Sequence, residues 1–282
     1  MCRICGLMSK KGIKNVKSIE NMRDTMIAGG PDGFGVWINK ERKVAFGHRR
    51  LSILDLSDMG AQPMVSSDGR FVICYNGEIY NFRKLREKYQ AKGYKFKSDC
   101  DTEVILAAYC FDGINAFTSF HGMFAVAIWD NKKQLLTLVR DRIGVKPLYY
   151  AYQNDEFSFG SELKSIMANP NFKRRINKRA FQLFLKYSYV PAPFSILENC
   201  HKLGPGQWLQ VDLEGKIEIG SWWDLKKNYN ADYVVRGSIQ TFGQTSRINA
   251  TLADLNQRKV VWSEKVDFDT DEIFQVQDQL SN

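Results

Sequence analysis

The sequence predicts an α+β fold in which helices cover antiparallel β-sheets, and three observations support this prediction. Predicted strands outnumber predicted helices, and neighbouring strands are joined as hairpins, which makes the sheets largely antiparallel. The chain has 282 residues, of which 44% are hydrophobic and 13% aromatic, so it can bury a sizeable core. Two such sheets covered by helices form a layered domain.

The first half of the chain supplies a buried strand and two helices. Residues 71–75 form a continuous apolar run that predicts a buried strand, and the turn dipeptide Asn76-Gly77 is expected to end it. Residues 81–91 predict an amphipathic helix. Asp101 begins a second helix, in which apolar residues recur at helical spacing.

The clearest hairpin signal comes next. Two apolar runs, residues 123–129 and 135–139, flank the polar turn 130–133. Further strands are expected near residues 148–151, 157–160 and 208–211.

The charge distribution divides the chain near the polar stretch 226–230. Residues 231–282 hold five Lys or Arg and eight Asp or Glu, a net charge of −3, whereas residues 1–230 carry +12. We therefore predict one domain over residues 2–225 and a small β-rich α+β segment over residues 231–282. That segment is expected to contain strands at 233–240, 248–255 and 260–266 and a helix at 271–280.

The net charge of +9 does not by itself indicate a nucleic-acid partner. Lys and Arg are spread along helical faces, as in residues 83–88, and no RNA-binding or helix-turn-helix signature is present. No apolar run has the length of a membrane span, and the N-terminus has no apolar signal region. We therefore expect a cytoplasmic protein without nucleic-acid or membrane partners, whose six cysteines are reduced thiols.

Cys2 is a candidate nucleophile because it stands directly behind Met1. If Met1 is removed, Cys2 carries a thiol and a free α-amine, and the amine can accept the proton as the thiol attacks. Cys2 and Cys5 also form a C-x-x-C pair, which is compatible with redox or metal chemistry. The segment is typical of a strand, however, where residues three apart face opposite sides, so no metal site is predicted.

Two later segments combine turn residues with polar groups. Gly30-Pro31-Asp32-Gly33-Phe34-Gly35 predicts a rigid turn with several positions open to positive φ, and it lacks the Lys-Ser/Thr of a phosphate loop. In residues 47–53, a predicted strand ends and two neighbouring arginines, Arg49 and Arg50, stand at its end. One guanidinium of such a pair clamps a carboxylate if a pocket holds it in place.

Asn76-Gly77 and Asp101 have both a structural and a chemical interpretation. Asn-Gly is a common turn dipeptide, yet an Asn amide beside a Gly backbone N–H also forms an oxyanion hole. Asp101 stands at a helix start, where a carboxylate commonly caps the helix.

Cys2 and these four segments, in this order and spacing, resemble the class II glutamine amidotransferase domain, in particular the glutaminase half of glutamine-hydrolysing asparagine synthetases. Amidotransferases of amino-sugar or purine synthesis fit less well at residues 47–53 and 141–150. The resemblance covers residues 2–225 and implies a four-layer αββα N-terminal-nucleophile hydrolase fold. Further matching motifs lie at residues 121–125, 140–150, 161–164 and 202–206.

The resemblance implies a glutaminase with a covalent intermediate. Cys2 would attack the side-chain amide carbon of L-glutamine, and water would hydrolyse the resulting γ-glutamyl thioester after ammonia leaves. Asn76 and the Gly77 N–H would stabilise the oxyanion. Arg50 would bind the α-carboxylate of the substrate, and Glu78 and Asp101 would bind its α-ammonium.

The chain departs from the family pattern close to Cys2. Arg3 stands where Gly usually follows the nucleophile, and Ala28-Gly29 stand where His-Arg usually precede Gly-Pro-Asp. Cys100 stands where Ser is common. Arg3 is expected to place a cation beside the thiol, where it either lowers the pKa of the thiol or crowds the pocket.

The asparagine synthetases continue into an ATP-pyrophosphatase domain, whose Ser-Gly-Gly-x-Asp-Ser loop is absent from this sequence. No cofactor is therefore expected here, since ATP and Mg belong to the missing synthetase part, which a separate domain or protein would supply. Residues 231–282 resemble a TolB-like segment of bacterial adenylate-cyclase-type regulators, joined here either naturally or as an artefact of fusion or truncation. An alternative function is a non-catalytic glutamine-binding regulatory protein with the glutaminase fold.

Overall fold

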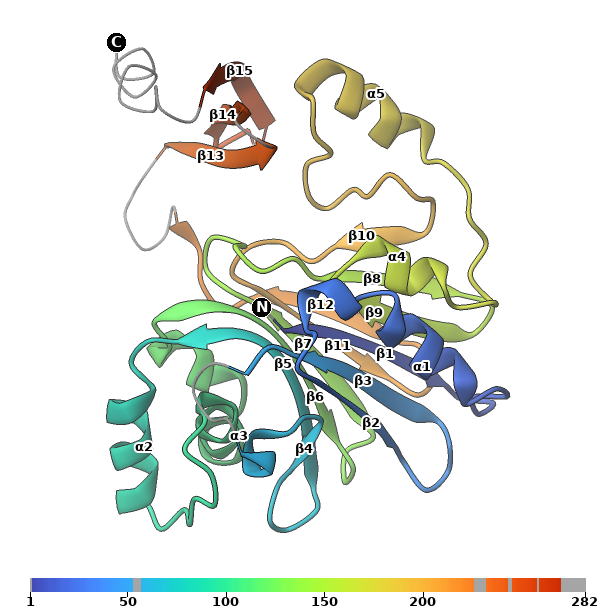
Figure 1. Ribbon diagram of the computed structural model, residues 1–282, viewed down its shortest axis with the longest axis vertical. Helices are drawn as coiled ribbons and strands as arrows, with labels where there is room; N and C mark the ends of the chain where they lie inside the picture. The colour runs from blue at the N-terminus through green and yellow to red at the C-terminus, as the bar shows by residue number, and fades with distance from the viewer. Residues whose placement is uncertain (1, 53–56, 226–231, 243–244, 258, 270–282) are drawn as a thin grey trace. The chain divides into compact units, whose positions relative to one another are not determined.

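The computed structural model describes residues 2–52, 57–225, 232–242, 245–257 and 259–269 (Figure 1). The chain forms two compact units, Met1–Trp223 and Asp224–Asn282.

The first unit is built on two antiparallel six-stranded sheets. In spatial order, the first sheet contains β10 (Cys200–Lys202), β8 (Tyr149–Gln153), β9 (Glu156–Gly160), β1 (Arg3–Ser9), β3 (Val44–Arg50) and β2 (Gly33–Ile38). The second contains β12 (Ile217–Ser221), β11 (Gln207–Asp212), β7 (Leu135–Arg140), β6 (Gly122–Asp130), β5 (Phe71–Ile79) and β4 (Met64–Val65). The predicted antiparallel pairing is confirmed.

The helices of the first unit include two that the sequence predicts, α2 (Phe82–Ala91) and α3 (Asp101–Asp112). The structure adds α1 (Lys17–Asp24), α4 (Leu163–Met167) and α5 (Lys178–Tyr187). Three short 3₁₀ turns are η1 (Ile27–Gly29), η2 (Asp58–Gly60) and η3 (Gly113–Ser119).

The two sheets stack face to face and helices cover both outer faces, which gives four layers. Side chains alternate along β1, so Ile4 packs between the sheets whereas Cys5 packs beneath α1. A third cluster fills the space between β5 and β6 and the helices α2 and α3. In Figure 1, α1 and α4 cover one side of this stack and α2 and α3 the other. The αββα fold is confirmed.

The predicted turn at Asn76-Gly77 is wrong, because β5 continues through both residues to Ile79. Asn76 pairs with Ala125, and Gly77 pairs with Phe124. A Cβ at position 77 would lie 2.1 Å from the carbonyl oxygen of Met123, so glycine is needed for close strand contact rather than for a turn. Pairing with β6 overrides the local turn preference.

The predicted rigid turn at residues 30–35 is also wrong. Gly33 begins β2, and Gly30 has an extended φ of −156° rather than a positive one. Gly35 serves a close approach instead, because a Cβ there would lie 2.0 Å from the carbonyl oxygen of Gln62.

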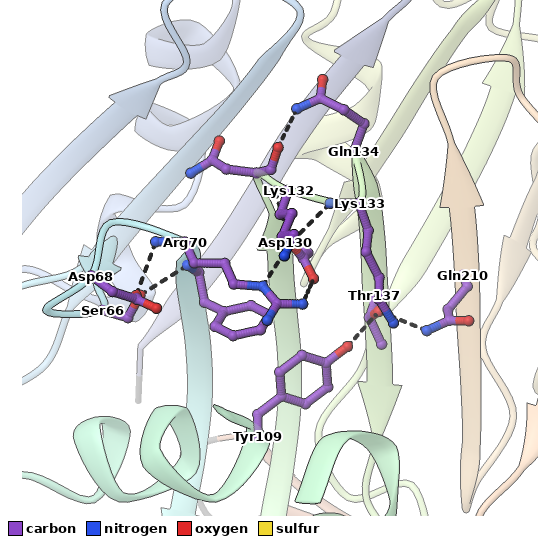
Figure 2. Close-up of polar contacts among 12 residues, drawn as sticks. Ser66, Asp68, Arg70, Tyr109, Asp130, Lys132, Lys133, Gln134, Thr137 and Gln210 are labelled. Atoms are coloured by element: carbon purple, nitrogen blue, oxygen red, sulfur yellow. Dashed lines mark hydrogen bonds and ion pairs between the residues drawn. The ribbon is translucent and has the colours of Figure 1, made fainter. Parts of the chain in front are cut away.

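The hairpin of β6 and β7 is confirmed, and Asp130 organises its turn (Figure 2). The carboxylate of Asp130 accepts the backbone N–H groups of Lys132 and Lys133 at 2.8 and 3.0 Å. It also accepts two bonds from Arg70, at 3.2 Å from Nε and 2.8 Å from Nη2. The turn is thereby tied to the residue that precedes β5. Below it, the hydroxyl of Tyr109 on α3 meets Thr137 of β7 at 3.0 Å.

The second unit contains a three-stranded antiparallel sheet in the order β13 (Tyr233–Phe242), β14 (Thr245–Asp254) and β15 (Lys259–Asp269). These strands confirm the three that the sequence predicts. Arg247 of β14 and Asp267 of β15 are directly opposite, and they form a two-bond ion pair. The helix predicted at residues 271–280 lies outside the described residues.

Candidate active site

Cys2 lies immediately before β1, at the edge of the space between the two sheets. Its thiol contacts Leu51, with Sγ 3.3 Å from the backbone nitrogen and 3.5 Å from the carbonyl oxygen. Burial raises the pKa of the Cys2 thiol, although the hydrogen bond from the Leu51 N–H opposes this. A thiol whose pKa is raised needs a base that takes its proton as it attacks a carbon atom.

Cys2 and Cys5 do not share a site. The Cys5 sulfur is buried beneath α1 and donates to the carbonyl oxygen of Gly47, 3.7 Å away. Among the residues that the structure describes, no group of three or more His, Cys, Asp or Glu side chains is arranged to hold a metal ion.

Arg50 is the last residue of β3 and precedes the Leu51 that contacts Cys2. Its Nη1 donates to the carbonyl oxygen of Ser57 at 2.9 Å. The neighbouring Arg49 points elsewhere, because its Nη2 pairs with Asp24 at the end of α1. The strand alternation thus separates the two guanidiniums and leaves Arg50 on the side of Cys2.

Asn76 is fully buried on β5, in the sheet that faces Cys2. Its Nδ2 lies 3.5 Å from the hydroxyl of Ser161, a long contact, and that hydroxyl accepts the backbone N–H of Ile4 at 3.0 Å. Within the described part of the chain, Oδ1 of Asn76 has no hydrogen-bond partner. A buried amide that is incompletely satisfied is expected to bind a ligand or a further polar group.

Asp101 is fixed to β5 by two hydrogen bonds that fall on the same oxygen. Its Oδ2 accepts the hydroxyl of Tyr75 at 2.7 Å and the backbone N–H of Ile79 at 3.0 Å. Burial raises the pKa of Asp101, although both bonds oppose this. Asp101 therefore belongs to the same edge of the sheet as Asn76 and Gly77, although it comes from α3.

Glu78 follows Gly77 on β5 and is half-buried, within electrostatic range of Asp101. Lys146 is 2% exposed, and its charge acts on the same region. Burial lowers the pKa of the Lys146 ammonium and the charge of Arg3 lowers it further, whereas the charges of Asp141, Glu78 and Cys2, in that order, oppose this.

Three sequence-predicted residues are each held in place by neighbours outside the predicted set: Cys2 by Leu51, Asn76 by Ser161, and Asp101 by Tyr75 and Ile79. Sequence reasoning assigned no role to Tyr75, Lys146 or Ser161. The position of Tyr75 directly before Asn76 could have suggested a role for Tyr75. The burial of Lys146 and the contact of Ser161 with Asn76 depend on the tertiary fold.

The chain resembles known proteins in sequence. Residues 1–223 match the family described as the glutamine amidotransferase domain. Asparagine synthetase [glutamine-hydrolyzing] 1 of Bacillus subtilis is 37% identical over 227 residues, which cover 79% of this chain and 35% of that protein. Asparagine synthetase [glutamine-hydrolyzing] 3 of the same organism is 35% identical over 244 residues, which cover 82% of this chain and 38% of that protein. The chain therefore spans little more than a third of the length of these relatives.

The fold also matches a solved structure. The glutamine phosphoribosylpyrophosphate amidotransferase of B. subtilis superimposes with a TM-score of 0.60 at 16% identity, over 79% of this chain and 49% of that chain. No helix among the described residues has the length and apolar character needed to cross a membrane. The family match covers most of the chain and coincides with the first compact unit. The chain belongs to the class II glutamine amidotransferase family.

Proposed function

We propose that residues 2–225 form a glutaminase that releases ammonia from L-glutamine for asparagine synthesis, with Cys2 as its nucleophile. The observations that carry the proposal are the Cys2 thiol, which is held by Leu51 next to Arg50, and the buried amide of Asn76, whose donor atom Nδ2 makes only a long contact of 3.5 Å with Ser161. These groups match the parts of an acyl-transfer site: a nucleophile, an oxyanion donor and a carboxylate-binding cation.

The burial of the thiol gives the α-amine its role. Because burial raises the pKa of the Cys2 thiol, a base must remove the proton during attack. Removal of Met1 exposes an amine on Cys2 itself, which accepts this proton while Sγ bonds to the side-chain amide carbon. The proton then passes to the leaving nitrogen, and ammonia departs as the γ-glutamyl thioester forms. Water attacks the thioester, which releases glutamate and restores the thiol.

Asn76 and Gly77 stabilise the negative oxygen that develops in both attacks. The amide of Asn76 is fully buried, where a hydrogen bond to a charged oxygen is stronger than in water. Gly77 adds its backbone N–H. Loss of one such donor typically lowers kcat by about 10²–10³-fold.

Arg50, Glu78 and Asp101 bind the two charged groups of the amino acid. Arg50 pairs with the α-carboxylate. The Tyr75 and Ile79 bonds occupy Oδ2 of Asp101, so Oδ1 is the oxygen that accepts the α-ammonium, together with Glu78. The carboxylates thereby favour a substrate with a free α-amine.

We also propose that the ATP-dependent synthetase chemistry resides outside this sequence, on a further domain or a separate protein. The ratio of lengths supports this, since the asparagine synthetases extend far beyond the matched region. The TolB-like character of residues 231–282 remains a proposal of the same kind.

The experiment is ammonia release from L-glutamine by the purified chain, after intact mass has confirmed loss of Met1. Turnover that Cys2→Ala abolishes supports the glutaminase. Cys110→Ala is the matched control, because Cys110 is a free thiol on α3 remote from these contacts, and it is expected to keep parental activity. A processed chain that binds glutamine without turnover would instead support the non-catalytic regulatory alternative.

A further inference from the structure

The side chain of Arg3 folds back onto the residue that precedes it. Its Nη1 donates to the main-chain oxygen of Cys2 at 3.1 Å, and its Nε donates to Oε1 of Glu162 at 2.5 Å. The other oxygen of Glu162, Oε2, pairs with Lys164 at 2.8 Å. The guanidinium therefore bridges the peptide carbonyl of Cys2 and a carboxylate that follows β9.

Gly29 provides the space for this bridge. A Cβ at position 29 would lie 2.7 Å from Cγ of Arg3 and 2.8 Å from both Cζ and Nε. These distances are far below normal contact, so any side chain at position 29 displaces the guanidinium. Arg3 and Gly29 are also two of the departures from the family pattern, in which Gly usually stands at position 3 and Arg at position 29. Because the two positions are in contact, we interpret the departures as one exchange, in which the arginine has moved from position 29 to position 3.

We propose that Arg3 is a positioning residue for Cys2 and that Gly29 is kept small to admit it. The thiol-bearing Cβ, the α-amine and the carbonyl group of Cys2 share one Cα, so holding the carbonyl limits rotation about the Cα–C bond and sets the directions of the bonds from Cα to Cβ and to the amine. Holding the carbonyl group by a hydrogen bond is a different role from activating the thiol by a positive charge, and the variants below separate the two. The inference rests on the proposed function, because it assumes that Cys2 is the nucleophile.

The main experiment measures glutaminase kinetics for Arg3→Met, which keeps the bulk of the side chain but removes its donors. Misplacement of a reacting group by about 1 Å costs up to about 10²-fold, so kcat is expected to fall about 10- to 100-fold while KM changes less than about threefold. Arg3→Lys keeps the charge but cannot bridge both partners, and its kcat is expected to lie between those of Arg3→Met and the parent. Lys164→Met is the matched control, since it removes an ion pair from the same carboxylate but leaves the Cys2 contact, and it should retain parental kcat.

A second set of variants tests the coupled exchange. Gly29→Arg alone crowds Arg3 and is expected to lower kcat about as much as Arg3→Gly does. In the double variant Arg3→Gly/Gly29→Arg, a guanidinium from position 29 enters the space that Arg3 has left. If the two substitutions acted independently, their fold-losses in kcat would multiply. We expect the kcat of the double variant to be at least about tenfold higher than that product predicts. Thermal unfolding of each variant separates loss of folding from loss of positioning.

These experiments distinguish failure of the positioning role of Arg3 from failure of the proposed glutaminase function. If the processed parent has no glutaminase activity, the proposed function fails. If the parent is active but folded Arg3→Met keeps parental kcat, only the positioning role fails. The pH dependence of Cys2 alkylation should be the same in Arg3→Met and the parent, and a shifted profile would overturn positioning in favour of thiol activation.

Discussion

Replacing Asp101 with Asn tests whether this carboxylate binds the ammonium group of the substrate. Both internal hydrogen bonds of Asp101, from Tyr75 and Ile79, fall on Oδ2. The carbonyl oxygen of an Asn side chain can take this place and keep both bonds. The amide nitrogen then occupies the position of Oδ1, where it presents hydrogen atoms to a cation instead of a negative oxygen.

The expected loss follows from the strength of one charged hydrogen bond. Such a bond contributes about 1.5–3 kcal/mol. Because about 1.4 kcal/mol corresponds to a factor of ten, kcat/KM for L-glutamine should fall about 10- to 150-fold, mostly through KM. Burial raises the pKa of Asp101, which means that its charged form opposes folding. The thermal midpoint of Asp101→Asn should therefore equal or exceed that of the parent.

The assay compares ammonia release from L-glutamine and from Nα-acetyl-glutamine, which lacks the ammonium. The parent should prefer L-glutamine strongly, and Asp101→Asn should lose most of that preference. Asp99→Asn is the matched control, since this carboxylate lies two residues away and its side chain is 93% exposed. A folded Asp101→Asn protein with parental KM and parental preference would refute the assignment.

Three other predictions concern the fold and the substrate carboxylate. In Gly77→Ala, the added Cβ lies 2.1 Å from the Met123 oxygen and 2.7 Å from Cα of Phe124, so the free energy of unfolding should fall by about 3 kcal/mol. Gly33→Ala, whose Cβ meets nothing closer than 3.6 Å, should keep the parental thermal midpoint, and equal midpoints for the two variants would contradict the reasoning. The pKa of Asp130 is lowered, because the bonds from Arg70 and the turn N–H groups outweigh the opposing effect of burial. The stabilisation by ionised Asp130 is therefore present above the ordinary carboxyl pKa and is lost as pH falls through the lowered value. The parent should have a higher thermal midpoint than Asp130→Asn at about pH 6, and this difference should be smaller at about pH 3. Arg50→Lys replaces a planar fork with a point charge and should raise KM for L-glutamine about tenfold without a comparable loss of kcat, which steady-state kinetics will show.

Local patterns predicted the elements whose signals are local. The β6–β7 hairpin has two apolar runs around a polar turn, and α2 and α3 have helical spacing of apolar residues. The short helix α1 was not predicted, because a helix of eight residues has few turns over which a period can be recognised. The wrong turn at Asn76-Gly77 has a similar origin, since a dipeptide preference cannot report pairing with a strand almost fifty residues later.

The site residues were named through motif order, whereas their connections depend on tertiary structure. The sequence places Asp101 at a helix start, but only the fold brings its carboxylate to Tyr75. Arg3 was expected to act on the thiol or to crowd it. Its position in the structure, against Glu162 and in the space left by Gly29, could not be read from residues that are far apart in the chain.

The mass of the chain during turnover tests the role of Cys2 most directly. Protein that is turning over L-glutamine is quenched with acid and digested, and its N-terminal peptide is weighed. Nucleophilic attack by Cys2 predicts a peptide that lacks Met1 and carries a γ-glutamyl group, which hydroxylamine removes. Steady ammonia release from protein that retains Met1, or from protein in which Cys2→Ala remains active, would contradict it.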